Sequence, residues 1–286
     1  MKVALQFFSV RNALKADPVG TMRKVAAMGY RYWEVCAFNP DSPYNYGLDL
    51  PVEEGKSLLQ ELGVKVIGSH IGEADMEDDG YLTKFFDYQA AIGCENPGVA
   101  AIFARDRDEI LVKCGLMNKC GRMCRERGMR FHYHTHFHDY QLFDGSRMID
   151  LIMENTDPEL MDLEVDTFWT VRGGVDPVEM IRQYAGRIVF LHQKDLSESA
   201  LFRKNLWDGT IDPAIPVPGW QSFAGLEDDF VEVGTGVLPI QDYIDAGNAA
   251  GIPYIILEQD YTKLSELESV QESMNAFRKF HGVEWD

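Results

Sequence analysis

The sequence predicts an α/β protein, a single-domain (β/α)₈ TIM barrel that spans residues 1–286. Two observations carry this prediction. Short β-rich runs alternate with amphipathic segments of helix length, and the alternation repeats eight times with no break in composition. Strict alternation implies parallel strands joined by helical crossovers, and eight such units favour a closed barrel over two doubly wound domains.

The repeated unit is marked by its glycines. Runs such as GYRYWEV, GMRFHYH and GRIVFLH each begin with a Gly, which suits the turn that ends the preceding helix. We expect eight strands, near residues 2–8, 31–36, 64–70, 97–103, 129–135, 160–166, 187–192 and 253–258. We expect eight helices, near residues 17–28, 51–62, 79–92, 106–127, 145–155, 176–185, 239–250 and 263–281.

One segment interrupts this alternation. Residues 196–236, between the seventh strand and its helix, form a long insertion that contains Trp207, Trp220 and three prolines. A connection of this length is usually either functional or disordered. Because it follows a strand, we expect it at the mouth of the barrel, as a lid or wall of the active site.

Composition and charge narrow the classes of partner. The chain has 27 Lys and Arg against 46 Asp and Glu, a formal net charge of −19, whereas a nucleic-acid binder needs a basic surface. No apolar run of about 18 residues is present, so no membrane partner is expected. The five cysteines are an odd number that fits reduced thiols, and the start MKVALQFFSV has no signal-peptide pattern, so we expect a cytoplasmic protein.

The ends of the predicted strands carry polar residues suited to metal binding and proton transfer. Catalytic groups of such barrels come from the C-terminal ends of the strands. There the chain has Gln6, Glu34, His70, His134 with His136, Asp166, His192 with Lys194, and Glu258 with Asp260. A single His at a strand end is more often structural, but the coincidence across several strands predicts one catalytic divalent ion: Mn²⁺, Co²⁺, Zn²⁺ or Mg²⁺. The imidazoles favour the first three.

Several motifs, in this order along the chain, resemble the xylose isomerase-like barrels, also called the sugar phosphate isomerase/epimerase superfamily. They are LQFFSVRNAL, YHTHFHDYQ, TDPELMDLEVDTFW, GGVDPVEMIRQYAGRIVFLHQKD, VEVGTG and YIILEQD. The resemblance implies a metal ion held by four side chains of the fifth to eighth strands, usually Glu, Asp, His and Glu. Asp166, His192 and Glu258 match three of them, and His134 stands where the fifth-strand Glu is usual.

The resemblance also implies an activity. Sugar isomerases and epimerases of this kind move a proton next to a metal-polarised carbonyl, and the epimerases use two metal-bound glutamates as the acid/base pair. With His134 in place of one of them, we expect Glu258 as one proton carrier and His136 or Lys194 as the other.

Other activities stay open at this point. Elimination from the same enediolate would make the chain a dehydratase, or a lyase acting on a keto-polyol or keto-glycoside. A DNA-repair endonuclease like endonuclease IV shares the fold, but the net charge of −19 argues against it. A sugar-binding barrel without activity is disfavoured by the intact Asp166, His192 and Glu258.

Further residues are predicted to contact the substrate. Gln6, Glu34, His70 and Arg11 are expected to bind substrate hydroxyls or to orient the metal ligands, and Trp169 to offer an apolar face to a sugar. The expected partner is therefore a small-molecule sugar. The sequence leaves open which sugar this is, whether it is phosphorylated, and whether the chain forms a homo-oligomer.

Overall fold

The structure, a computed structural model, describes residues 1–203 and 226–285. Within this part of the chain, eight parallel strands close into a barrel in the order β1-β12-β9-β8-β5-β4-β3-β2. The barrel prediction is therefore confirmed. Its strands are β1 (Lys2–Gln6), β2 (Tyr32–Cys36), β3 (Lys65–Ile71), β4 (Asn96–Val99), β5 (Phe131–His134), β8 (Met161–Asp166), β9 (Ile188–Gln193) and β12 (Tyr254–Leu257).

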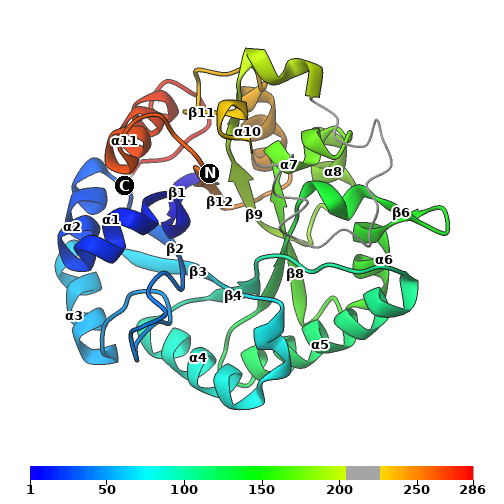
Figure 1. Cartoon of the computed structure of the whole chain (residues 1–286), viewed down its shortest axis with the longest axis horizontal. Helices are drawn as coiled ribbons and strands as arrows, with labels where there is room; N and C mark the ends of the chain where they lie inside the picture. Colours follow the sequence, from blue (N-terminus) through cyan, green and yellow to red (C-terminus); the bar gives the residue numbers. More distant parts are fainter. Residues whose placement is uncertain (204–225, 286) are drawn as a thin grey trace.

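Helices surround the barrel (Figure 1). They are α1 (Arg11–Ala16), α2 (Pro18–Met28), α3 (Val52–Leu62), α4 (Asp79–Ile92), α5 (Arg107–Arg125), α6 (Met148–Asn155), α7 (Thr167–Arg172), α8 (Pro177–Gln183), α10 (Ile240–Ala249) and α11 (Glu266–Phe277). The sequence pattern missed α1 and α7, because six residues are too few to show a helical period. It also missed β6 (Leu142–Phe143) and β7 (Ser146–Arg147), which form a small antiparallel pair.

The helix boundaries follow from local chemistry. The carboxylate of Asp17 accepts a hydrogen bond from the Gly20 amide at 2.9 Å and so caps the start of α2. That helix ends at Gly29, whose φ of 112° is a left-handed conformation that most residues avoid. Gly63 and Gly93 end α3 and α4 in the same way.

The interior of the barrel has an apolar layer at its base, made of Ala4, Tyr32, Ile67, Phe190 and Ile256. Residues two apart on a strand share a face, so the next inward residues on four of these strands are polar. They are Gln6, Glu34, His192 and Glu258, each two positions after a residue of the apolar layer. The strand period therefore places a polar layer above an apolar one, toward the C-terminal ends of the strands.

The described ends of the predicted insertion lie at the C-terminal side of β9. There β10 (Asp195–Leu196) pairs antiparallel with β11 (Phe230–Val231). Phe230 stacks on Phe168 of α7, with ring centroids 4.7 Å apart, and lies 5.8 Å from Trp169. Asp229 and Arg172 form a buried ion pair at 2.9 Å. The described part of residues 196–236 thus packs against α7, whereas Trp207, Trp220 and the prolines lie outside the described residues.

Among the helices of residues 1–203 and 226–285, none is long and apolar enough to cross a bilayer.

Candidate functional site

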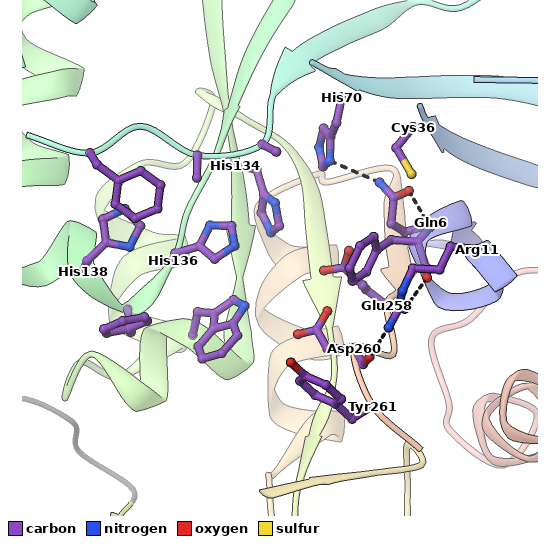
Figure 2. A pocket seen from close by; sticks show the side chains of 16 residues that line it. Gln6, Arg11, Cys36, His70, His134, His136, His138, Glu258, Asp260 and Tyr261 are labelled. Atoms are coloured by element: carbon purple, nitrogen blue, oxygen red, sulfur yellow. Dashed lines mark hydrogen bonds between the residues drawn. The ribbon is translucent and has the colours of Figure 1, made fainter. Parts of the chain in front are cut away.

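Four predicted metal ligands converge at the mouth of the barrel. His134, Asp166, His192 and Glu258 are buried, and their donor atoms all lie within 4.8 Å of one another. They come from the ends of β5, β8 and β9 and from the residue after β12, which are neighbours around the barrel. We call this group the outer cluster; Figure 2 shows His134 and Glu258 in the pocket above it.

The outer cluster fits a divalent cation. It presents two imidazole nitrogens and two carboxylates, a mixed set typical of catalytic sites. His134 Nε2 lies 3.5 Å from Asp166 Oδ2, and His192 Nδ1 lies 3.3 Å from Glu258 Oε2. Lys194 Nζ lies 2.5 Å from Asp166 Oδ2 and also contacts Glu258 Oε2. A cation in this cluster would therefore share its carboxylate oxygens with the ammonium group of Lys194.

Burial and neighbouring charges set the protonation of this cluster. Burial lowers the pKa of His134 well below its usual value, which leaves the neutral imidazole that metals bind. Burial opposes the charge of Lys194, but Asp166 and the neighbouring carboxylates outweigh it and raise the pKa of Lys194. Burial also opposes the charge of Glu258, yet Lys194 and His192 hold the pKa of Glu258 below its usual value. The site therefore combines an ionised carboxylate with an ammonium group.

His192 carries a different charge before an ion binds. Burial opposes its protonation, but Glu164, Glu34 and Glu258 outweigh burial and raise the pKa of His192 well above the usual value. A metal ion would have to displace a proton from its Nδ1.

A second group of possible ligands lies deeper in the barrel. Glu34, His70, His132 and Glu164 are buried, and their donor atoms also lie within 4.8 Å of one another. We call them the inner cluster. The sequence prediction assigned no role to His132 and Glu164. The signal that could have found them is the strand period, since each precedes a predicted ligand, His134 or Asp166, by two residues.

A cavity of about 510 Å³ opens above the outer cluster. It is lined by Gln6, Phe8, Arg11, Cys36, His70, Ala100, Ala101, Phe103, His134, His136, Phe137, His138, Trp169, Glu258, Asp260 and Tyr261. Most predicted site residues thus meet at one pocket (Figure 2). Glu34, Asp166, His192 and Lys194 are fully buried and do not belong to its lining.

His136 stands on the wall of this pocket. Its ring centroid lies 4.6 Å from that of His134 and 5.8 Å from that of Trp169. Burial lowers the pKa of His136 well below its usual value, so the ring is neutral and can accept a proton. Its buried Nδ1 has no hydrogen-bond partner among the residues that the structure describes.

The predicted substrate-binding residues differ in their freedom to contact a ligand. Gln6 Nε2 donates to Glu34 Oε2 at 2.7 Å, so both side chains already have protein partners. Arg11 lines the pocket but donates to the carbonyls of Phe8 and Asp260, at 2.6 and 2.8 Å. Of this set, Glu34 lies beneath the pocket rather than on its wall.

Comparison with known proteins defines the family to which this chain belongs. The model of the xylose isomerase-like TIM barrel family matches residues 22–280, so the chain belongs to that family. An inosose dehydratase of Geobacillus kaustophilus is 39% identical over 85 residues, which are 30% of this chain and 27% of that protein. The first curated relatives are matched over only about a quarter to a half of their own length.

Solved structures share the fold over almost the whole chain. A sugar phosphate isomerase/epimerase from Parabacteroides distasonis has a TM-score of 0.77 at 20% identity, covering 99% of this chain and all of that one. The IOLI protein, crystallised with a zinc atom, has a TM-score of 0.69 at 14% identity, covering 97% of this chain and 96% of its own.

Proposed function

We propose that this chain is a divalent-metal-dependent enzyme that transfers a proton next to the carbonyl group of a sugar or keto-polyol, as an isomerase or epimerase. The observation that carries the proposal is the convergence of the outer cluster, a neutral His136 and an ionised Glu258 at one pocket. The zinc atom of the IOLI protein and the isomerase/epimerase name of the Parabacteroides structure support it.

The ion would be held by His134, Asp166, His192 and Glu258. When bound, it would polarise a substrate carbonyl and stabilise the negative charge that develops on the oxygen. Glu258 and His136 line the same pocket, so a substrate in it would meet two groups in their proton-accepting state. One group can remove the proton next to the carbonyl and, once protonated, return it at the neighbouring carbon, which isomerises the substrate. Return on the other face would require the second group first to take up a proton from water.

Dehydration is a second candidate, and the charge of Lys194 favours it. Elimination of water needs a base for the proton and an acid for the departing hydroxyl. The site holds proton acceptors in Glu258 and His136. The Lys194 ammonium lies beneath the pocket and contacts Glu258, so it would supply a proton to a substrate through that carboxylate. The curated relatives that match part of this chain are named inosose dehydratases. A dehydratase or lyase acting on a keto-polyol would use the same enediolate.

The endonuclease alternative is favoured by one feature of the structure, the inner cluster, and is still disfavoured by the net charge. The inner cluster supplies further His and Glu side chains of the kind that a multi-metal nuclease would need. The net charge of −19 still disfavours binding to DNA, because association would have to overcome repulsion from the phosphates.

One experiment tests the proposal and separates the two candidates. Metal-loaded protein is incubated with inosose and a panel of keto-sugars in D₂O, and the products are followed by NMR and mass spectrometry. An isomerase or epimerase gives a product of unchanged formula with solvent deuterium at the reacting carbon, unless a shielded base returns the same proton. A dehydratase gives a product that lacks one water.

The matched variant is Glu258→Gln, which keeps the shape of the side chain but loses the base. Turnover should fall by a factor of about 10² or more. The proposal would be refuted if no substrate gave either turnover or deuterium exchange. Intact transfer of hydride between carbons, without solvent label, would remove His136 and Lys194 from the mechanism and leave Glu258 as a ligand only.

A further inference from the structure

The inner cluster has the residue types of a metal site, yet we propose that it binds no ion and instead fixes His192 as an Nδ1 ligand of the outer cluster. Glu34 and Glu164 are then positioning residues. The inference rests on the proposed function in one respect, namely that the outer cluster holds the ion. Of the two roles expected for Glu34, substrate binding and ligand orientation, it selects ligand orientation.

His192 belongs to both clusters through its two ring nitrogens. Nδ1 lies 3.3 Å from Glu258 Oε2 in the outer cluster. Nε2 lies 2.6 Å from Glu34 Oε2 and 3.0 Å from Glu164 Oε1 in the inner cluster. A neutral imidazole carries one N–H and one lone pair, and two carboxylates at Nε2 hold the proton there. When a metal ion replaces the proton on Nδ1, the imidazole is neutral and the lone pair of Nδ1 is therefore directed at the outer cluster.

Gln6 distinguishes the inner cluster from a metal site. The Phe8 amide donates to Gln6 Oε1 at 3.1 Å, and Gln6 Nε2 donates to Glu34 Oε2 at 2.7 Å. These two bonds define which end of the amide is the nitrogen. The same Nε2 lies 3.2 Å from His70 Nδ1, which must then act as an acceptor.

The proton of a neutral His70 consequently sits on Nε2, the nitrogen that faces the inner cluster. This N–H donates to Glu164 Oε2 at 2.8 Å. A nitrogen that carries a proton has no lone pair for a cation. His70 is thus a hydrogen-bond donor to Glu164 rather than a ligand, and the inner cluster lacks one of its four donors.

Two glycines leave room for the side chains of the inner cluster. A Cβ atom on Gly68 would lie 2.6 Å from Glu34 Oε1, and one on Gly98 would lie 2.3 Å from His132 Nε2. Only glycine leaves room for these side chains at the two positions. The hydrogen bonds from Gln6 to Glu34 and from His70 to Glu164 hold the two carboxylates in position before any ion binds, as orientation of a ligand requires.

Carboxylates that accept the second N–H of a metal-bound His fix its tautomer and raise its basicity, and their loss typically weakens metal binding by about 10–100-fold. We therefore expect one ion per chain. Glu164→Gln and Glu34→Gln should keep that stoichiometry while weakening the affinity for Zn²⁺ by such a factor. The readout is the affinity itself, measured by competition with a chromophoric chelator and independent of turnover.

The matched control is Asp162→Asn, on the same strand two residues before Glu164. Asp162 pairs with Arg130 at 2.6 Å and belongs to neither cluster, so Zn²⁺ affinity should not change. Metal content is measured by mass spectrometry on wild type, on these variants and on Asp166→Ala. Two carboxylate variants are used so that, if one misfolds, the other still tests the inference. Circular dichroism verifies the fold of each.

Two results would overturn the inference. Two ions per chain in the wild type, with the second lost in His132→Gln and retained in Asp166→Ala, would make the inner cluster a metal site. One ion with unchanged affinity in both carboxylate variants would show that they do not position His192. If the wild type bound no ion at all, the proposed function would be contradicted as well. This outcome is distinguishable from the other two, which overturn only the inference about the inner cluster.

Discussion

Asp166 Oδ1 accepts a hydrogen bond from the backbone amide of Trp169 at 2.8 Å, so a predicted metal ligand is also the N-cap of α7. Its other oxygen, Oδ2, faces His134 and Lys194 in the outer cluster. The start of the helix that carries Trp169 and the position of the carboxylate are thus set by one side chain. This double role permits a test in which metal binding is removed either alone or together with the helix cap.

Asp166→Asn keeps a capping oxygen but loses the charge, whereas Asp166→Ala loses both. We expect both variants to lose bound metal, because neither offers an anionic oxygen to the ion. In the metal-free state, Asp166→Ala should be less stable than Asp166→Asn by about 1 kcal/mol, the usual contribution of an N-cap. Metal analysis and urea unfolding measure the two effects. Metal content equal to wild type in Asp166→Ala would exclude Asp166 as a ligand.

Lys194→Met should separate metal binding from turnover. The Lys194 ammonium contacts the carboxylates of Asp166 and Glu258, so it competes with a cation for their oxygens. We expect Zn²⁺ affinity to stay equal or increase, while turnover falls by about 10²-fold or more if Lys194 supplies a proton. Chelator competition and steady-state kinetics provide the comparison. Unchanged turnover would restrict Lys194 to balancing the buried carboxylates.

The same variant should be less stable without metal. Removing one partner from a buried charge network leaves carboxylates without compensation, at a cost of about 3–5 kcal/mol. Saturating Zn²⁺ should restore much of this loss, since an ion can neutralise the same oxygens. Thermal unfolding with and without Zn²⁺ measures the recovery.

The stability of the protein toward acid should depend in part on His138. Burial lowers the pKa of His138 to about 4, and its ring stacks on Phe103 with centroids 4.4 Å apart. A His with a depressed folded-state pKa stabilises the fold fully above about pH 6.5, and this contribution is lost as the pH falls toward 4. The shift corresponds to about 3 kcal/mol across that window.

His138→Gln should therefore show a smaller fall in unfolding free energy between pH 6.5 and 4 than wild type. His281→Gln is the control for replacing a histidine by glutamine, because the His281 side chain is exposed. Urea titrations at several pH values measure both. Parallel profiles for wild type and His138→Gln would contradict a buried neutral His138.

Two adjacent aspartates test how the described end of the insertion is anchored. Asp229 forms a fully buried ion pair with Arg172, whereas Asp228 pairs with Lys263 on the surface. Asp229→Ala should lower the free energy of unfolding by about 3–5 kcal/mol, because it leaves a buried guanidinium without that partner. Asp228→Ala should cost less than about 1 kcal/mol. Equal costs would show that the buried pair does not anchor the segment.

Much of the fold was predictable from the sequence. Gly29 and Gly63 end helices where the pattern placed them, because a left-handed C-cap has a strong residue preference. Helix α7 was not predictable, because a capping Asp166 and six residues give no periodic signal. The pocket residues Phe8, Phe103 and Tyr261 were also missed, since no sequence pattern distinguishes an aromatic residue of a pocket wall from one of the core.

The sequence by itself determined which side chains share a face. The two-residue period of β5 and β8 puts His132 with His134 and Glu164 with Asp166, whatever the rest of the chain does. The positions at the strand ends and the family resemblance indicated His134 and Asp166 as ligands. The two-residue period alone does not tell which residue of each pair belongs to the outer cluster. That depends on the level at which neighbouring strands pair, such as Asp166 beside His192 in the β8–β9 register.

Only the tertiary structure decided the partners across the barrel. His192 and Glu34 are 158 residues apart in the chain, yet their side chains meet at 2.6 Å because closure of the barrel leaves only β12 and β1 between β9 and β2 and turns both side chains into the interior. Periodicity along one strand carries no information about the strand on the opposite wall. The stagger of the strands in a closed barrel sets which residues of distant strands lie at the same level. It therefore decides which nitrogen of His192 faces the carboxylates of the inner cluster and which faces the metal site.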